Sequence, residues 1–485
     1  MRGWCSALAA GGLLVLGCAG AAPPSEARPT MAVDDGAGAV GAPTGARRVA
    51  KEPTTPPSNA EALPRDRAAA VIHAAMEEVS ARRGLPPKRR VQARWVGRGE
   101  LLDVVDRLSA EGLPEHAVTG NEALLVGLGV VPIDFDFERS VRALMGEQLA
   151  GLYEPGVGIM YMAEDLEDSV REVTLAHELV HALQDQHFDL EQKLGWAPDK
   201  SDAAGAIHAL AEGDATLAML SDAARGAQGA GAWMDAAIRM QLETSSDGVG
   251  VPAIVARSAA ATYSDGILFV AALHARGGWA AVDEAWRAPP VSTEQVLHVE
   301  KYYARELPEE VPIPAPATPE LGEGTLYHDV IGEQGLRVLL EEWVPRRTAV
   351  AAASEWQGDR LAVYELHGVY AIAWRVRYDS WTSAQRGGLA MARGILTVPG
   401  RRSSLPEITA EEAQAAWTGG WTCRVRHGLG PMGVALQDRE LVVVAGPFEW
   451  DGAAVRSSTD CAASRAWALR VLSGELGSVV APAAE

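Results

Sequence analysis

Residues 176–190 read AHELVHALQDQHFDL, and this stretch decides which fold the chain is expected to adopt. Apolar residues recur around it with helical spacing, so we expect a helix from about Leu166 to Gln186. On that helix His177 and His181 lie four residues apart and share one face, where both imidazoles can reach one metal ion. Glu178 would lie beside the open side of that ion, where a carboxylate can take a proton from water. The stretch therefore predicts a metal site on a helix with a general base next to it.

A third ligand is predicted further along the chain. Residues 203–224 are apolar nearly all round, which indicates a buried helix, and Glu212 lies within them. A buried carboxylate is costly unless it pairs with a cation or a metal, so we expect His177, His181 and Glu212 to form one ligand set. The alternative is a carboxylate satisfied by an arginine or by His208, one turn earlier.

His187 is the competing third ligand, because it follows His181 by six residues, the spacing found in metzincins. In metzincins a glycine lets the chain leave the helix, whereas here that place is Gln184, which continues it. On a continuing helix His187 points about 120° away from His181. We therefore expect His187 to pack or form a hydrogen bond behind the site.

The stretch 176–190 resembles the signature of a group of bacterial secreted or lipoprotein zinc metallopeptidases of gluzincin type, distant relatives of thermolysin. EGDAT at 212–216 and PPVSTEQVLH at 289–298 are similar to the same group, and WQGDR at 356–360 extends the resemblance weakly. The resemblance implies a zincin-like fold, with a small twisted sheet beside the active-site helix and a helical half that supplies the third ligand. It also implies one Zn²⁺ per chain and hydrolysis of peptide bonds, with Glu178 as general base.

One position departs from this resemblance. Thermolysin-like enzymes carry an aspartate four residues after the ligand glutamate, where this chain has Thr216. Metal-bound histidines are usually oriented by a second hydrogen bond, so the group that orients the first histidine, His177, is expected elsewhere, and Asp214 and Asp185 are the candidates.

His298 is the second candidate catalytic residue. It lies downstream of Glu212, where gluzincins commonly place a histidine or tyrosine that donates to the oxygen that becomes negatively charged during attack. The alternative is that His298 caps a helix or bridges to Glu294.

The N-terminus is typical of an exported, anchored protein. A short apolar run ends in VLGC at 15–18, which resembles a bacterial lipobox, so we expect a signal peptide over residues 1–17 and lipid on Cys18. The alternative is a plain secretory signal. Residues 18–63 are rich in Ala, Gly, Pro, Ser and Thr without an apolar period, which predicts a disordered linker. The expected location is extracytoplasmic, on a membrane of the bacterial cell envelope.

The expected fold class is α+β, with a zincin-like domain over residues 64–310 and a smaller α+β domain over 320–485. Within the first domain we expect a hairpin over 151–162, whose second strand Ile159–Met162 is an exposed edge that a peptide substrate joins. Further helices are predicted in this domain at 68–83, 101–108, 141–149, 251–276 and 279–287.

The proline-rich residues 311–319 are expected to form a linker or surface crossing. The last domain should contain a hairpin over 361–378, a helix, strands at 421–425 and 440–444, and a final helix at 461–472.

Cysteine usage agrees with export. Cys5 leaves with the signal peptide and Cys18 carries lipid, so Cys423 and Cys461 remain as a pair in an oxidising compartment. We expect one disulfide between them, which would tie the final helix to a strand.

Composition limits the classes of molecule that the chain is expected to bind. The 485 residues carry a formal net charge of −21, which makes nucleic acid a poor partner but does not name a substrate. The expected partner, a peptide or protein substrate, is what the resemblance implies. Two rivals stay open. A binding lipoprotein could keep a zincin scaffold without turnover, although such a protein typically loses the general base that Glu178 supplies here. A zinc amidase could act on cell-wall material.

Overall fold

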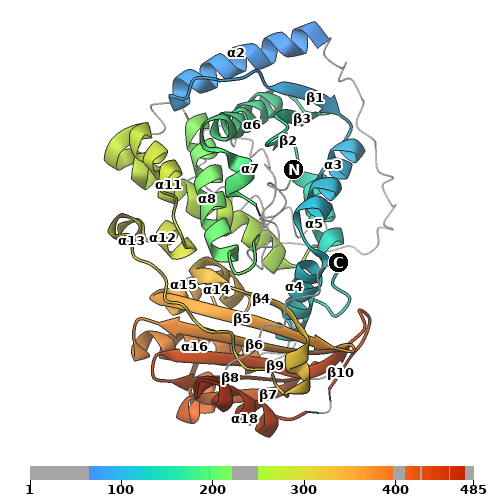
Figure 1. Ribbon diagram of the computed structural model, residues 1–485, viewed down its shortest axis with the longest axis vertical. Coiled ribbons are helices and arrows are strands. Elements are labelled where there is room, and N and C mark those ends of the chain that lie inside the picture. The colour runs from blue at the N-terminus through green and yellow to red at the C-terminus, as the bar shows by residue number, and fades with distance from the viewer. Residues whose placement is uncertain are drawn as a thin grey trace, which may run out of the picture.

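The computed structural model describes residues 65–195, 197–220, 250–396, 410–426, 429–457 and 459–475. The chain has the predicted α+β fold. Figure 1 shows a helical half formed by the earlier part of the chain and, below it, a broad sheet with helices formed by the later part. None of the helices described is long and apolar enough to span a bilayer. The predicted signal peptide, the lipid site Cys18 and the linker lie outside the described residues.

The helical half contains most of the predicted helices. Its elements are α2 (Arg65–Arg83), β1 (Gln92–Val96), α3 (Arg98–Gly112), α4 (Glu115–Leu128), α5 (Phe137–Gln148), β2 (Gly151–Glu154), β3 (Ile159–Ala163), α6 (Asp168–Phe188), α7 (Leu190–Lys193), α8 (Ser201–Met219), α11 (Ala253–Arg287), α12 (Thr293–Leu297) and α13 (Val299–Ala304). The two helices predicted over 251–287 form α11, which is interrupted where they were expected to part, at Gly277 and Gly278.

The small sheet of the helical half has a different edge strand from the one predicted. β2 and β3 form the expected antiparallel hairpin, but β1 pairs parallel with β3 on the other side, and the order is β1-β3-β2. The strand Ile159–Met162 is therefore central, and the prediction that it is an exposed edge was wrong. The sequence reasoning failed because β1, which precedes β3 by two helices and more, has no counterpart among the predicted strands. The edges of this sheet are β1 and β2.

The C-terminal half is a sheet covered by helices. Its elements are η1 (Glu320–Glu323), β4 (Thr325–Asp329), α14 (Gly332–Leu340), α15 (Arg346–Ala353), β5 (Trp356–Leu366), β6 (Val369–Tyr378), α16 (Trp381–Leu396), α17 (Ala410–Ala416), η2 (Thr418–Gly420), β7 (Trp421–Arg426), β8 (Gly430–Gln437), β9 (Glu440–Trp450), β10 (Val455–Arg456) and α18 (Cys461–Leu472). The strand order is β4-β5-β6-β9-β8-β7, and β10 pairs with β9. The predicted hairpin, later strands and final helix are confirmed.

Helix α4 joins the two halves, and it too was missing from the predicted elements. Two glycines let it approach the sheet: a Cβ on Gly120 would lie 2.4 Å from the Tyr327 Cβ, and a Cβ on Gly127 would lie 2.3 Å from the Ile372 Cδ1. One hydrophobic core includes buried residues from both halves. Helices α6 and α8, which carry His177, His181 and Glu212, thus contribute to the same core as the sheet.

The proline-rich segment 311–319 lies across the C-terminal sheet. Ala315 is buried, and its carbonyl accepts a hydrogen bond from Trp467 Nε1 over 2.8 Å. Tyr364 donates its hydroxyl to the Pro314 carbonyl in the same way. The segment is held by side chains of β5 and α18, which matches a surface crossing.

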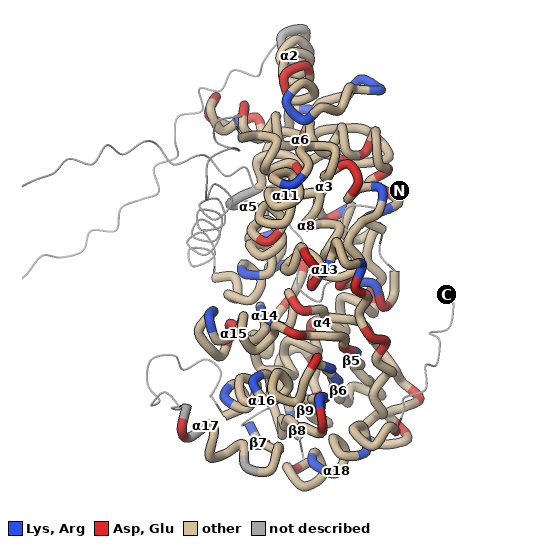
Figure 2. The backbone as a smooth tube through the Cα atoms, turned by 90° about the vertical axis from the view of Figure 1, so that its left-hand side faces the viewer, with Lys and Arg blue, Asp and Glu red and all other residues tan. Residues whose placement is uncertain are grey.

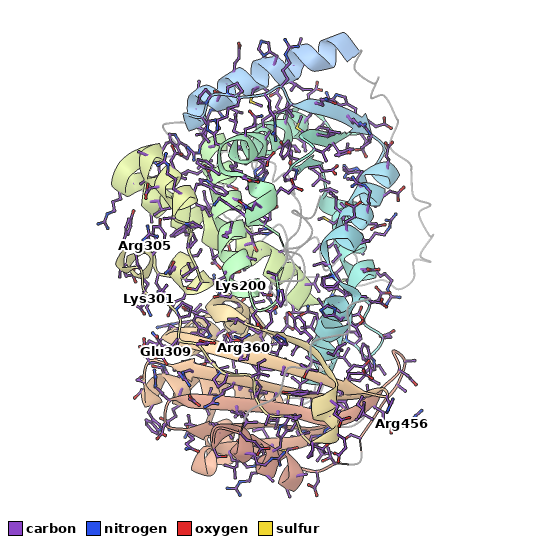
Figure 3. All side chains as sticks on the ribbon, viewed as in Figure 1. Lys200, Lys301, Arg305, Glu309, Arg360 and Arg456 are labelled. Carbon is purple, nitrogen blue, oxygen red and sulfur yellow. A yellow bond between two sulfur atoms is a disulfide. The ribbon has the colours of Figure 1, made fainter. Side chains whose placement is uncertain are left out.

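Charged side chains of both signs are interspersed over both halves, as Figure 2 shows. Several of them lie at the junction of the helical half and the sheet, where Figure 3 labels Lys200, Glu309 and Arg360. Arg360 of β5 pairs with Asp199 just before α8, and Glu309 pairs with Arg439 over 2.8 Å. These pairs add polar contacts to the apolar core that joins the halves.

The predicted disulfide is confirmed. Cys423 of β7 and Cys461 at the start of α18 are bonded, with their Cα atoms 5.8 Å apart and a separation of 38 positions in sequence. The bond ties the last helix to the edge strand of the sheet.

Reduction of this bond should destabilise the C-terminal half without removing metal. Closing a loop of 38 residues contributes about 4 kcal/mol in the chain-entropy model. Thiol titration of the denatured, unreduced protein should find no free thiol from the pair, and Cys423→Ala with Cys461→Ala should unfold at lower denaturant. A full complement of thiols before reduction would contradict the bond.

Candidate metal centre

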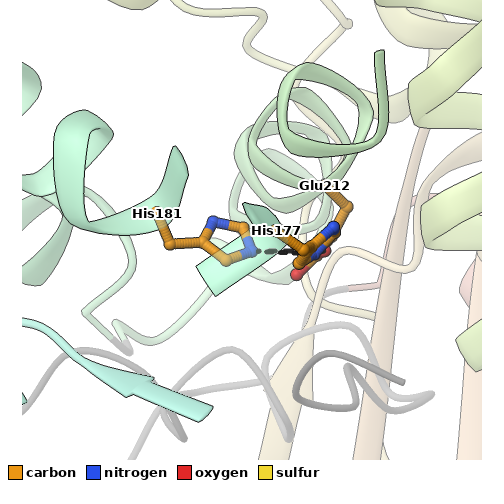
Figure 4. Close-up of side chains that lie close together, drawn as sticks. All are labelled: His177, His181 and Glu212. Carbon is orange, nitrogen blue, oxygen red and sulfur yellow. Dashed lines mark hydrogen bonds and ion pairs between the residues drawn. The ribbon is translucent and has the colours of Figure 1, made fainter. Parts of the chain in front are cut away.

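Three side chains from two helices converge at one point, as Figure 4 shows. His177 Nε2 lies 3.1 Å from His181 Nε2 and 3.1 Å from Glu212 Oε2, and His181 Nε2 lies 3.5 Å from the same oxygen. They form the only group of metal-ligand side chains found in the described part of the chain, and it is the predicted set.

The spacing of these atoms fits a tetrahedral ion. Ligand bonds of about 2.0–2.1 Å at tetrahedral angles place ligand atoms about 3.3 Å apart, close to the three distances that separate the His177, His181 and Glu212 donors. Two imidazoles and one carboxylate, with no thiolate, are also a donor set typical of catalytic zinc. These three residues would hold the ion and leave a fourth position open.

Burial and charge tune the ligands. All three side chains are buried. Burial opposes charge on His181, but the facing Glu212 carboxylate outweighs burial and raises the pKa of His181. Burial would raise the pKa of Glu212, but the same pairing with His181, together with a hydrogen bond from His177, holds that pKa low. These opposite pKa shifts favour a protonated His181 beside an ionised Glu212, and a divalent cation bound by these side chains would displace the proton on His181.

The local sequence explains how closely α8, which carries Glu212, approaches α11. A Cβ on Gly213 would lie 2.1 Å from the Gly266 carbonyl oxygen of α11, and a Cβ on Gly266 would lie 2.1 Å from the Ala209 carbonyl oxygen. The backbones of α8 and α11 thus touch directly beside Glu212. Glycine at 213 and 266 is therefore required for the close packing of α8 against α11 next to Glu212.

Glu178 is buried on the helix that carries both histidines. It follows His177 on α6, its side chain is fully buried, and its charge acts on His181. The carboxylate therefore lies inside the protein rather than on the outer face of the helix, and its role as general base stays a prediction.

His208 does not satisfy Glu212, which removes the alternative reading of that carboxylate. Both ring nitrogens of His208 are buried without a hydrogen-bond partner in the described structure. Burial lowers the pKa of His208 to about 4, so the ring is neutral. Glu212 instead faces the two histidines of α6.

The group that orients His181 is Gln184, which the sequence analysis did not propose. Gln184 Oε1 lies 2.8 Å from His181 Nδ1, and Gln184 Nε2 donates to Asp214 Oδ2 over 3.1 Å. Asp214 therefore acts on the histidine through an amide. Neither of the two candidates expected to orient His177 bonds to it in the described structure, and Asp185 instead accepts a hydrogen bond from Tyr153 over 2.9 Å.

Two further residues flank the centre in ways that sequence left open. The Tyr263 ring of α11 lies with its centroid 6.4 Å from that of His177, beside the ligands. His187 lies outside the ligand group, and its Nε2 is 2.7 Å from the Pro86 carbonyl oxygen, as expected for a hydrogen bond behind the site. In the sequence, the feature that could have indicated Tyr263 is a tyrosine within the alanine-rich stretch that forms α11.

His298 lies at the junction of α12 and α13, apart from the ligand group. Its Nε2 is 2.9 and 3.0 Å from the two carboxylate oxygens of Glu333 on α14, and this hydrogen bond raises the pKa of His298. The partner is thus Glu333 rather than Glu294. The pairing favours a structural histidine, and the catalytic role of His298 stays a prediction.

His298→Ala separates the two roles. Glu333 is buried and would lose its hydrogen bond with His298, so we expect the free energy of unfolding to fall by about 1–3 kcal/mol with the zinc content unchanged. Thermal midpoint, zinc content and turnover are measured together. A loss of turnover by about 10² or more with an unchanged midpoint would instead assign His298 to catalysis.

Comparison with known proteins adds no relative, since no family model, no curated protein and no solved structure matches this chain. The resemblance of residues 176–190 to gluzincin metallopeptidases stays a prediction.

Proposed function

We propose that this protein is an extracytoplasmic zinc metallopeptidase that hydrolyses peptide bonds. The observation that carries the proposal is the convergence of His177, His181 and Glu212 at tetrahedral spacing, with the Glu178 carboxylate buried on the same helix. The export signal and lipid site predicted for residues 1–18 support a location in the cell envelope.

The roles follow from the chemistry of the side chains. A zinc ion in this centre would polarise the substrate carbonyl and lower the pKa of a bound water. Glu178 takes a proton from the attacking water and delivers it to the departing amine. Gln184 holds His181 so that its Nε2 faces the centre.

The small sheet indicates where a peptide would lie. β2 is an edge strand and packs against α6, which carries two of the ligands. An extended peptide that pairs with the sheet would therefore join β2, in place of the central strand expected from sequence.

Peptide-library cleavage followed by mass spectrometry tests the proposal. The purified protein is assayed as isolated, after treatment with a chelator, and after zinc is restored, with Glu178→Gln assayed in parallel. We expect cleavage that the chelator removes and zinc restores. Zinc binding without cleavage of any peptide would favour the silent binding lipoprotein, and release of cell-wall amides alone would favour the amidase.

A further inference from the structure

The side chains that follow the ligands on α6 bond to one segment near the start of the described chain. We call residues 83–89 the N-terminal strap. Lys88 and Arg89 donate their backbone N–H groups to Gln186 Oε1 over 2.7 and 3.0 Å. Gln186 Nε2 donates back to the Arg89 carbonyl over 3.1 Å. The side-chain amide of Gln186, near the end of α6, thus bonds to the strap through both its oxygen and its nitrogen.

Two neighbours of Gln186 reinforce this attachment. His187 Nε2 lies 2.7 Å from the Pro86 carbonyl oxygen, and the Asp185 carboxylate pairs with the Arg89 guanidinium. The residues that follow the metal-binding motif are therefore used to hold the strap.

Arg83 is the last residue of α2 and the first of the strap. Its side chain lies behind the ligands, between Asp214 of α8 and Asp283 of α11, and is fully buried. It makes two hydrogen bonds to Asp214, of 2.5 and 3.1 Å, and Nη2 lies 2.8 Å from Asp283 Oδ1. The guanidinium also lies 4.6 Å from the centre of the Trp279 ring. Planar bidentate pairing of this kind fixes the direction of the carboxylate.

Asp214 in turn orients His181, through the side-chain amide of Gln184. It accepts a hydrogen bond from Gln184 Nε2, which also donates to the Ala211 carbonyl over 3.0 Å. With both acceptors on its NH₂ group, the amide has to present its oxygen to His181 Nδ1, at 2.8 Å. Nδ1 therefore carries the hydrogen, and Nε2 is left for a metal.

We propose that Arg83 is a positioning residue of the metal centre, acting through Asp214 and Gln184 on His181. The proposal rests on the proposed zinc site but not on the reaction carried out there. Without Arg83, the buried Asp214 carboxylate keeps the Trp286 indole and the Gln184 amide as donors but loses its bidentate charged partner, so its direction, and with it that of Gln184, is less well fixed. Loss of such an outer partner typically lowers metal affinity about 10- to 100-fold.

The test measures the zinc dissociation constant by competition with a chromogenic chelator, using zinc alone as the ligand. Arg83→Met is compared with Arg82→Met, a matched change on the same helix, because Arg82 also bonds α8, at the Met219 carbonyl, but does not contact Asp214. Arg83→Lys keeps the charge without the bidentate geometry, and it serves if Arg83→Met does not fold. Circular dichroism and thermal midpoint establish that each variant is folded.

We expect a dissociation constant about 10- to 100-fold higher for Arg83→Met, a smaller rise for Arg83→Lys, and a value within about twofold of the wild type for Arg82→Met. Equal affinity in wild type and both Arg83 variants would overturn the proposal, as would equal losses in the Arg82 and Arg83 variants. Zinc binding that follows this order without any peptide cleavage would overturn the proposed function alone.

Discussion

Glu178→Gln keeps its zinc and loses turnover by about two orders of magnitude or more. The substitution removes the base and leaves His177, His181 and Glu212 in place, so the metal stoichiometry should match the wild type. An amide of the same shape cannot accept the proton of the attacking water or return it to the leaving amine. Peptide turnover and zinc content are measured on the same preparation.

The matched control is Glu172→Gln, because Glu172 is exposed on the same helix and carries the same charge. It should keep both zinc and turnover. Wild-type turnover in Glu178→Gln would show that the assigned mechanism is wrong, whatever the metal content.

Glu212→Ala strips the metal, whereas His187→Ala does not. The first change removes one of three ligands and leaves two histidines 3.1 Å apart. The second removes only a hydrogen bond to the Pro86 carbonyl. Metal analysis after dialysis against a weak chelator distinguishes them. Full zinc in the Glu212 variant together with loss in the His187 variant would reverse the assignment of the third ligand.

The sequence was sufficient where chemistry and helical spacing coincide. Two histidines four apart on α6 and a glutamate in the largely apolar helix α8 identify the three converging side chains, because each pattern can be recognised within one helix. The Cys423–Cys461 bond followed from counting cysteines. These inferences need no knowledge of how separate elements pack.

The failures concern residues whose partners come from elsewhere in the chain. Ile159–Met162 is central because β1, more than 60 residues earlier, pairs with it. Gln184 orients His181 only because Asp214 lies on a neighbouring helix. The partner of His298 is Glu333 of the C-terminal half rather than Glu294, while the catalytic role of His298 stays a prediction. No local pattern contains such information, since strand order and the acceptor of an amide are properties of the packed molecule.

The hydrogen bonds around Asp214, behind His181, also bear on the order in which the parts of the chain fold. Arg83 and Asp214 are separated by 131 positions, and Trp286, which donates to the same carboxylate over 2.8 Å, follows 72 positions later. A growing chain that has reached the end of α8 already contains every metal ligand, but the indole that completes the surroundings of Asp214 does not yet exist. Contacts this distant in sequence form slowly, because closing a long loop costs entropy before it is rewarded. Zinc should therefore be held tightly only late in folding, after α11 has packed, and a fragment that ends before residue 286 should bind it weakly despite having all three ligands.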